Sequence, residues 1–285
     1  MLRLSTARKL QILRGIRRVV LAGRHAAGQR SSRVTCARGG LNWSLDLDEG
    51  IDLSIFLLGS FEPLTARLIA RLLRPGMTAI DIGANVGAHA LPMAKAVGPA
   101  GRVFAIEPTA WAFDRLSSNL SLNPELKQSL VAIHGLLGQE GTVAPAAIYS
   151  SWNIDAPSAA KHPVHGGSAH SLGDARVLTL DQMIEEHRLV RVDLVKLDVD
   201  GFECSVLRGG LQALARFAPP IVFELAPYAL AEQGSSLGEL LEILRGLGYE
   251  FRFEWSQELL PASLDEISKL IVSGGSRNVL AVSAR

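Results

Sequence analysis

Residues 78–87 read TAIDIGANVG, an apolar strand followed at once by a turn of small residues that leads into the next helix. Gly83 and Gly87 allow the backbone to turn tightly and to come close to a ligand. Asn85 stands where a third glycine is expected, and asparagine is among the few residues that tolerate left-handed backbone geometry. A glycine-rich turn is weak evidence for a ligand on its own, so the residues around it decide its meaning.

Short apolar strands alternate with helices on both sides of this turn. Such alternation is typical of an α/β fold with a doubly wound, mostly parallel sheet. Pro92 should lie in the first turn of its helix or kink it, and Asp181 is expected to cap the helix that follows it. The last two strands lack a long crossover helix between them, which favours an antiparallel pair. We predict strands at 78–82, 102–106, 130–134, 192–198, 221–224, 249–254 and 278–283, and helices at 86–97, 110–121, 182–188, 202–215 and 237–247.

Two acids near the glycine-rich turn indicate a cofactor that contains a ribose. Glu107 ends the next strand, where a carboxylate can accept hydrogen bonds from both ribose hydroxyls. A nicotinamide dinucleotide needs a pyrophosphate cradle of glycines, which is poor here because Asn85 and Ala88 stand in it. S-adenosylmethionine has no phosphate, and Asp81 suits the ammonium of its amino-acid end. We therefore prefer S-adenosylmethionine and keep an NAD(P)-dependent oxidoreductase as the alternative.

A second group of acids lies at the end of a later strand, in the run KLDVDGFE at 196–203. Carboxylates so close together repel one another unless they hold a ligand or share a proton. Asp198 is expected to contact the methionine part of the donor. Asp200 and Glu203 are either catalytic or stabilise the positive end of the next helix. Glu224 ends the following strand, where it either takes a proton from an acceptor hydroxyl or is a buried acid with its own partners.

Together, these motifs resemble those of the FkbM-type methyltransferases over about residues 42–283. They stand in that family's order: GSFEP at 59–63, DIGANVG at 81–87, FAIEP at 104–108, TLD at 179–181 and VKLDVDGFE at 195–203. The resemblance implies a Rossmann-like class I methyltransferase fold with a seven-stranded, mostly parallel sheet and an antiparallel C-terminal hairpin. It also implies S-adenosyl-L-methionine as the methyl donor and O-methylation of a hydroxyl on a sugar, a glycan or a secondary metabolite.

The resemblance also implies roles for individual residues. The sequence departs from the family at Asp200, where glutamate is usual, and near Gly138, where an acid that contacts adenine is often found. A hydroxyl acceptor needs a general base, and His89 and His134 are candidates beside the carboxylates. We expect cofactor contacts from Asp81, Gly83, Ala84, Asn85, Gly87, Glu107, Pro108 and Asp198, substrate contacts from Phe61, Glu62 and His89, and catalytic roles for Asp200, Glu203 and Glu224.

Metal ions are a competing explanation for some of these polar residues. Asp198 and Glu224 offer the oxygen ligands that Mg²⁺ prefers, but no further acid completes the set. His162, His165 and His170 lie in a Gly- and Ser-rich loop, where spacing alone is poor evidence for zinc. We therefore predict no metal, and we interpret this loop as a lid or as a segment that recognises the acceptor.

Charge is divided sharply along the 285 residues, although the formal net charge is only +1. Residues 1–45 contain ten basic residues and no acid, so a segment of +10 is joined to a remainder of −9. This basic arm is interpreted as a solvated leader, an amphipathic helix on an anionic membrane, a nucleic-acid-binding segment or an organellar presequence. We expect an arm at 1–41 that contains a weak helix at 1–23 and a linker at 24–40, a cap segment at 42–75 and a methyltransferase domain at 76–285.

Composition sets the remaining limits. Apolar residues make up 48% and charged residues 20% of the chain, as in globular proteins. Two cysteines cannot form a disulfide framework, which favours the reducing cytoplasm. Stretches of about 18 uncharged apolar residues, the length that spans a membrane, do not occur. We expect a small-molecule or glycan acceptor and no nucleic acid as partner, because the body is acidic, and leave the oligomeric state open.

Overall fold

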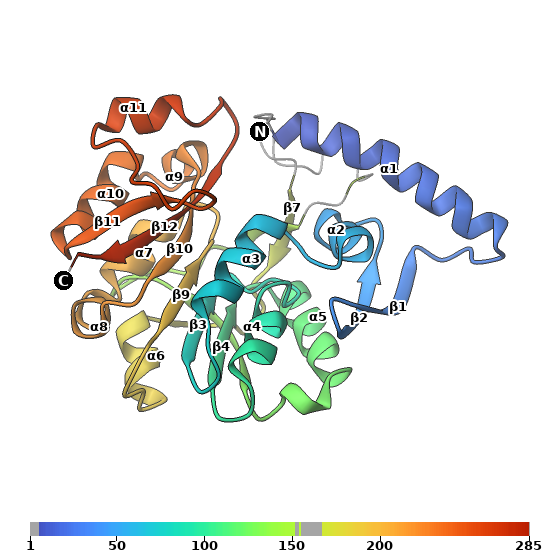
Figure 1. Ribbon diagram of the computed structural model, residues 1–285, viewed down its shortest axis with the longest axis horizontal. Helices are drawn as coiled ribbons and strands as arrows, with labels where there is room; N and C mark the ends of the chain where they lie inside the picture. Colours follow the sequence, from blue (N-terminus) through green and yellow to red (C-terminus); the bar gives the residue numbers. More distant parts are fainter. Residues whose placement is uncertain (1–5, 152–153, 155–166, 285) are drawn as a thin grey trace.

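The computed structural model of the chain describes residues 6–151, 154 and 167–284. A sheet of eight strands in the order β11-β12-β10-β9-β3-β4-β5-β8 forms its centre (Figure 1). Neighbouring strands are parallel except for the two pairs that β12 makes. In chain order, the strands are β3 (Thr78–Ile82), β4 (Arg102–Glu107), β5 (Leu130–Leu137), β8 (Arg176–Leu178), β9 (Leu194–Leu197), β10 (Ile221–Leu225), β11 (Tyr249–Phe253) and β12 (Arg277–Ser283).

Seven of these strands reproduce the predicted sheet. β3 lies between β9 and β4 and is buried along its whole length. β12 runs antiparallel to both β10 and β11, which confirms the antiparallel hairpin predicted for the C-terminus. The short strand β8 extends the sheet beyond β5 and is an addition to the expected seven. The predicted class I fold is therefore confirmed, with one extra strand at its edge.

Helices cover both faces of the sheet, and each face has its own hydrophobic core (Figure 1). Neighbouring residues of a strand point to opposite faces, so Ile80 and Phe223 enter one core whereas Ala79 and Val222 enter the other. Pro92 lies in the first turn of its helix, which is one of the two predicted outcomes. The first core is covered by α6 (Leu180–Glu186), α7 (Glu203–Arg208), α8 (Leu211–Phe217) and α10 (Leu237–Gly246), and the second by α3 (Pro63–Leu72), α4 (Ala90–Val97) and α5 (Ala110–Ser121).

Capping of α6 differs from the prediction. The N-cap residue is Thr179, whose side chain forms a reciprocal capping box with Gln182. The Asp181 carboxylate instead accepts hydrogen bonds from the backbone N–H groups of Gln212 and Ala213 in the first turn of α8, at 3.2 and 2.8 Å. The prediction that Asp181 caps α6 is therefore wrong, because Asp181 caps a different helix.

The helix predicted at 202–215 is two helices, α7 and α8, separated by Gly209 and Gly210. A Cβ atom on Gly209 would lie 2.0 Å from the carbonyl oxygen of Gly138, and one on Gly210 would lie 2.6 Å from a side-chain carbon of α6. This close packing requires glycine at both positions and explains the break. A further helix, α9 (Pro227–Glu232), follows β10, where none is predicted.

The basic N-terminal segment is folded against the body. Within the described residues, α1 (Thr6–Ala26) confirms the helix predicted there. The expected linker at 24–40 is wrong in part, because β1 (Arg33–Arg38) pairs antiparallel with β2 (Leu41–Asp46). Trp43 and its neighbours on the same face of β2 are buried in the second core. Burial of this apolar face explains why the segment forms a hairpin rather than a linker.

The remaining elements surround the sheet. No single helix of the described residues is long and apolar enough to cross a membrane, although α2 (Gly50–Leu58) and α3, bent by 70°, pass this test as a pair by length and composition. His162 and His165 lie outside the described residues. The elements not yet named are the 3-10 helix η1 (Pro124–Leu126), the antiparallel ribbon of β6 (Ala147–Ser151) and β7 (Ser168–Ser171), and α11 (Leu264–Lys269).

Candidate functional site

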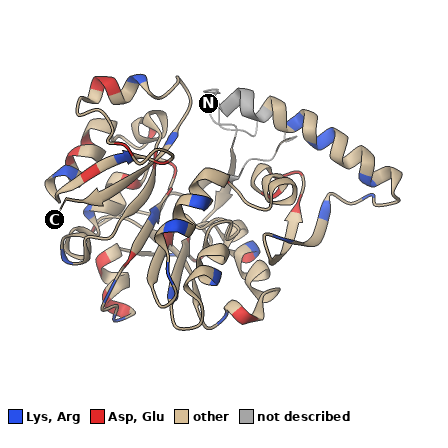
Figure 2. Ribbon diagram, in the orientation of Figure 1, with Lys and Arg blue, Asp and Glu red and all other residues tan. Residues whose placement is uncertain are grey.

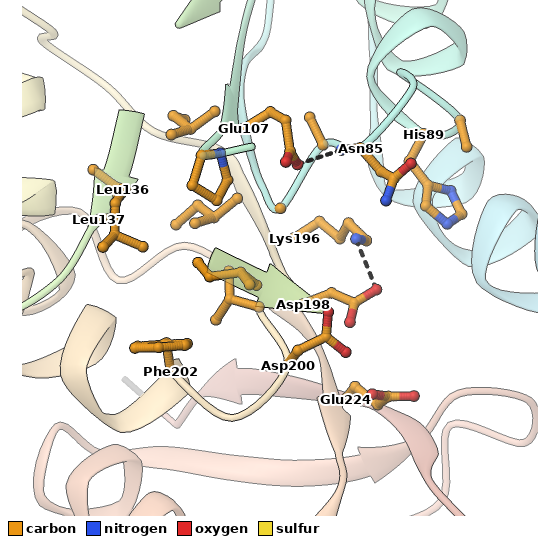
Figure 3. A pocket seen from close by; sticks show the side chains of 18 of the residues that line it. Asn85, His89, Glu107, Leu136, Leu137, Lys196, Asp198, Asp200, Phe202 and Glu224 are labelled. Atoms are coloured by element: carbon orange, nitrogen blue, oxygen red, sulfur yellow. Dashed lines mark hydrogen bonds and ion pairs between the residues drawn. The ribbon is translucent and has the colours of Figure 1, made fainter. Parts of the chain in front are cut away.

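A cavity lies at the carboxyl ends of β3, β4, β9 and β10, the edge at which doubly wound sheets bind ligands. It encloses about 1000 Å³, part of which is open to solvent. Figure 3 shows an apolar end, with Leu136 and Phe202, and an acidic end, with Asp198, Asp200 and Glu224. Eleven of the fourteen residues predicted for the site line this cavity: Phe61, Glu62, Gly83, Ala84, Asn85, His89, Glu107, Pro108, Asp198, Asp200 and Glu224.

The glycine-rich turn brings two strands into close contact at the cavity. Gly83 has a φ of 82°, and a Cβ atom there would lie 1.8 Å from the carbonyl oxygen of Asp198. Asn85 has a φ of 50°, the left-handed geometry that asparagine tolerates. Gly87 does not line the cavity, and a Cβ atom on it would collide with leucines of α4 and α5. Gly83 is therefore required by the strand contact, and Gly87 by helix packing.

Glu107 at the end of β4 holds the turn in place. Its Oε2 accepts a hydrogen bond from the N–H of Asn85 at 2.9 Å (Figure 3). Its Oε1 accepts from the N–H of Thr109 at 2.9 Å and from the Thr109 hydroxyl at 2.5 Å. Burial raises the pKa of Glu107, and these hydrogen bonds oppose that rise. Because each carboxylate oxygen has two lone pairs, Oε2 can accept a further hydrogen bond from a ligand hydroxyl.

Asp81 lies beneath the turn and does not line the cavity. Its side chain is fully buried, and within the described residues neither carboxylate oxygen has a hydrogen-bond partner. The Lys196 Nζ lies 3.7 Å from Asp81 Oδ1 and 3.1 Å from Asp198 Oδ2. Burial lowers the pKa of Lys196, but the charges of Asp198 and Asp81 outweigh this and raise it. Lys196 is therefore an ammonium that links the two acids.

The apolar end consists of residues that the sequence analysis missed. Leu136 and Leu137 end β5, and Phe202 precedes the first residue of α7. Ile148 lines the cavity and packs in one cluster with Leu136, against which Phe202 lies. Leu136 and Leu137 could have been predicted from their position at the end of the third parallel strand, because the carboxyl ends of parallel strands lie at the same edge of the sheet. Apolar side chains arranged in this way suit a flat, weakly polar group.

The acidic end gathers three carboxyl groups, those of Asp198, Asp200 and Glu224. Burial and the charge of Asp198 raise the pKa of both Asp200 and Glu224 well above their ordinary values. Asp200 also has a φ of 48°, a left-handed geometry that is costly for a residue other than glycine. Tyr228 of α9 lines the cavity in addition and was not predicted. A raised pKa makes the ionised form of a carboxyl a stronger base, which suits it to proton transfer.

The three predicted substrate residues lie together beside the acidic end. The His89 Nε2 is 3.8 Å from Glu62 Oε2, and the Phe61 and His89 rings lie 5.8 Å apart. Glu62 also accepts a hydrogen bond from Asn278 Nδ2 at 2.8 Å. Burial raises the pKa of Glu62, but interactions with His89 and other partners outweigh it, so that the pKa is lowered. Glu62 is therefore an ionised carboxylate beside the His89 ring.

Two candidates for the general base lie outside the cavity lining. Glu203 is buried, and its Oε1 accepts hydrogen bonds from the N–H groups of Val199 and Gly201 at 3.2 and 3.4 Å. This arrangement fits the alternative that Glu203 stabilises the start of α7. Burial raises the pKa of Glu203 to about 7. His134 does not line the cavity: its Nδ1 lies 3.2 Å from Asp174 Oδ1, and its Nε2 lies 3.2 Å from the carbonyl oxygen of Pro108, which does.

Metal ligands were the other interpretation of these polar residues. In the part of the chain that the structure describes, no three His, Cys, Asp or Glu side chains are grouped so that they could hold a metal ion. Asp198 and Glu224, the pair considered for Mg²⁺, both line the cavity. His170 stacks on Trp111 with ring centroids 4.5 Å apart, and burial lowers its pKa. His170 thus has a structural contact of its own.

Comparisons with known proteins place the chain among methyltransferases. The hexuronic acid methyltransferase AglP of Haloferax volcanii is 28% identical over 139 residues, which cover 47% of this chain and 50% of that protein. The methyltransferase sdnD of Sordaria araneosa is 28% identical over 154 residues, which cover 46% of this chain and 59% of that protein. The chain therefore spans about half the length of the curated relatives that it matches.

Solved structures give weaker likenesses. The methyltransferase FkbM of Methylobacillus flagellatus is 14% identical with a TM-score of 0.42, over 76% of this chain and 50% of that one. An O-methyltransferase of Thermotoga maritima is 15% identical with a TM-score of 0.42, over 82% of this chain and 71% of that one. The strand order, and not these scores, defines the fold.

A family model settles the relationship. The model of the methyltransferase FkbM domain matches residues 81–251, which is more than half of the chain. The match begins at Asp81 and includes the glycine-rich turn, Glu107 and the acidic run at 196–203, the features that surround the cavity. The chain therefore belongs to the FkbM methyltransferase family.

Proposed function

We propose that this chain transfers a methyl group from S-adenosyl-L-methionine to a hydroxyl oxygen of a sugar, a glycan or a secondary metabolite. The family supports the reaction type, and the names of two relatives, a hexuronic acid methyltransferase and sdnD, support this range of acceptors. The observation that carries the proposal is the cavity at the ends of β3 and β4, where the glycine-rich turn meets Glu107. Free thiols at Cys36 and Cys204 support the cytoplasm as its compartment.

The residues present fit the proposed methyl donor. Asp81 has two buried oxygens that lack hydrogen-bond partners among the described residues, and a water that bridges them to the donor ammonium would supply such a partner. Glu107 would accept hydrogen bonds from the ribose hydroxyls. Leu136 and Phe202 would cover the adenine ring. Asp198 would face the methionine part of the donor. When bound, the donor supplies a methyl group that is already activated by its sulfonium.

The acidic end would hold the acceptor and remove its proton. As the new O–C bond forms and the S–C bond breaks, the acceptor hydroxyl must lose a proton to a base. Asp200 and Glu224 line this end with raised pKa values, so the ionised form of either is a stronger base and can receive that proton. His89, beside Glu62, is the third candidate. Phe61 and Glu62 reach the cavity from the expected cap segment at 42–75, which supports a role for that segment in acceptor binding.

The oxidoreductase alternative receives no support from the family or the geometry. The turn contains Asn85 and Ala88 where a pyrophosphate cradle needs glycine. The acidic end also offers carboxyl groups where a phosphate would need hydrogen-bond donors. A nicotinamide cofactor is therefore the weaker interpretation of the same sheet edge.

Titration calorimetry with S-adenosylhomocysteine tests the proposal. We expect the wild-type chain to bind this product and Glu107→Gln to bind it about 10–100-fold more weakly, because hydrogen bonds to charged groups contribute about 1.5–3 kcal/mol. Glu125→Gln is the matched control, because Glu125 is exposed in η1. Absence of both heat and a thermal shift at saturating ligand would contradict the proposal. A quench of NADH fluorescence on binding would favour the alternative.

A further inference from the structure

The helix α1 carries an apolar stripe on the side that faces away from the body. Ile12, Ile16 and Val19 are 51%, 39% and 73% exposed. Their spacing of four and three residues places them along one side of the helix. Single exposed apolar residues are common on protein surfaces, but three in a row on one helix mark an interaction surface. We call these residues and Arg18, which is exposed beside them, the outer face of α1.

The opposite side of α1 is tied to the body, so the outer face has a fixed direction. Leu13, Val20 and Leu21 pack in a cluster with buried residues of the body. The Arg17 guanidinium forms an ion pair with the Asp48 carboxylate. Arg14 Nε donates a hydrogen bond to the backbone carbonyl of Ile154 at 3.0 Å. Arg14 and Arg17 therefore point toward the body, and the apolar stripe faces the solvent.

The N-terminal segment that carries the outer face is basic. Residues 1–45 contain ten basic residues and no acid, and Figure 2 shows basic residues and no acidic ones along the described part of α1. Arg18 and Arg30 are exposed, whereas Arg33 lies 3.7 Å from the Asp46 carboxylate. Apolar side chains flanked by cations are complementary to an anionic phospholipid surface.

We propose that the outer face of α1 binds the surface of an anionic phospholipid membrane, with the helix lying in the plane of the headgroups. Ile12, Ile16 and Val19 would enter the boundary between headgroups and acyl chains, and Arg18 would contact lipid phosphates. A second copy of the chain fits less well, because pairing two outer faces would bring two basic segments together. Nucleic acid also fits less well, because its phosphates would leave the apolar stripe exposed to water.

Vesicle co-sedimentation of the full chain tests this surface. We expect binding to vesicles of phosphatidylcholine mixed with phosphatidylglycerol, little binding to phosphatidylcholine alone, and weaker binding as salt is added. Val19→Asp should weaken binding about tenfold, since it places a carboxylate in the apolar stripe. Val190→Asp is the matched control, because Val190 is 82% exposed on the loop after α6.

Three results would overturn the proposal. The first is no binding of the wild-type chain to the anionic vesicles. The second is an equal loss in Val19→Asp and Val190→Asp. The third is a dimer in sedimentation analysis that Val19→Asp dissociates while vesicle binding is absent, which would assign the outer face to a second copy. Calorimetry with S-adenosylhomocysteine on the same variants reports the catalytic site separately, so the two proposals fail independently.

Discussion

Two turns at the ends of neighbouring strands form the centre of the site, and each turn covers a buried acid in different surroundings. The glycine-rich turn after β3 and the acidic turn after β9 each cover a buried acid: among the described residues, both oxygens of Asp81 and one oxygen of Glu203 lack a hydrogen-bond partner. Asp81 lies 3.7 Å from the Lys196 ammonium. Glu203 accepts only backbone hydrogen bonds among the contacts described here, and burial raises its pKa to about 7. The two acids thus differ in their surroundings. Asp81 lies beside the Lys196 ammonium and is proposed to contact the donor through a bridging water, whereas Glu203 stabilises the backbone at the start of α7.

The largest effect should come from the carboxyls around the acidic turn. Asp200→Asn or Glu224→Gln removes a group that can receive the acceptor proton, and we expect kcat to fall by about 10²–10⁴-fold for the residue that acts as base. Affinity for S-adenosylhomocysteine should change by less than about twofold, since neither residue is assigned to the donor. The measurement needs an acceptor, which mass spectrometry of metabolites that gain one methyl can identify. Unchanged kcat in both variants would show that neither Asp200 nor Glu224 is the general base.

Glu203 should affect folding and its pH dependence more than catalysis. Its folded-state pKa of about 7 exceeds the ordinary 4.5, so the folded state favours the neutral carboxyl. The resulting stability is fully present below pH 4.5 and is lost as the pH rises through 7. The shift corresponds to about 3 kcal/mol.

Urea unfolding of wild type and Glu203→Gln at several pH values measures this contribution. The neutral amide should flatten the decline in the free energy of unfolding between about pH 4.5 and 7. Glu125→Gln, on the surface, should leave the decline unchanged. A decline of equal size in Glu203→Gln would show that another group causes it.

Asp81 should give the smallest of these effects, and on the donor alone. Asp81→Asn keeps the shape but removes the charge, so we expect affinity for S-adenosylhomocysteine to fall about 3–10-fold, as for a single hydrogen bond. Asp265→Asn is the control, because Asp265 lies exposed on α11. Equal affinities in calorimetry for Asp81→Asn and wild type would mean that Lys196 alone satisfies Asp81.

The strands were predictable because each is a short apolar segment bounded by a turn. β3 matches its predicted range at 78–82, and the position of Glu107 at the end of β4 follows from the same pattern. Side-chain direction beneath the turns was not predictable. Glu203 and Asp200 belong to one acidic run, yet only Asp200 lines the cavity. Backbone geometry decides between them, since Asp200 adopts a positive φ and Glu203 begins α7.

Capping and close packing account for the other differences. Thr179 and Asp181 are both good caps, and only the position of α8 shows which helix Asp181 serves. The division of α7 from α8 depends on Gly209, which packs against a carbonyl 71 residues earlier, at Gly138. The hairpin of β1 and β2 depends on burial against α5 and the second core. Such long-range contacts do not appear in local sequence patterns.

Left-handed backbone geometry is concentrated where the cavity lies. In the described residues, six residues other than glycine have positive φ, and three of them, Glu62, Asn85 and Asp200, line the cavity. Each such conformation costs on the order of 1–3 kcal/mol. Glycine would avoid this cost, so selection for higher thermal stability would favour glycine at these positions. The protein would then lose side chains that face the ligand. Substitutions that raise the thermal stability of this chain should therefore be made on the surface helices, away from the two turns.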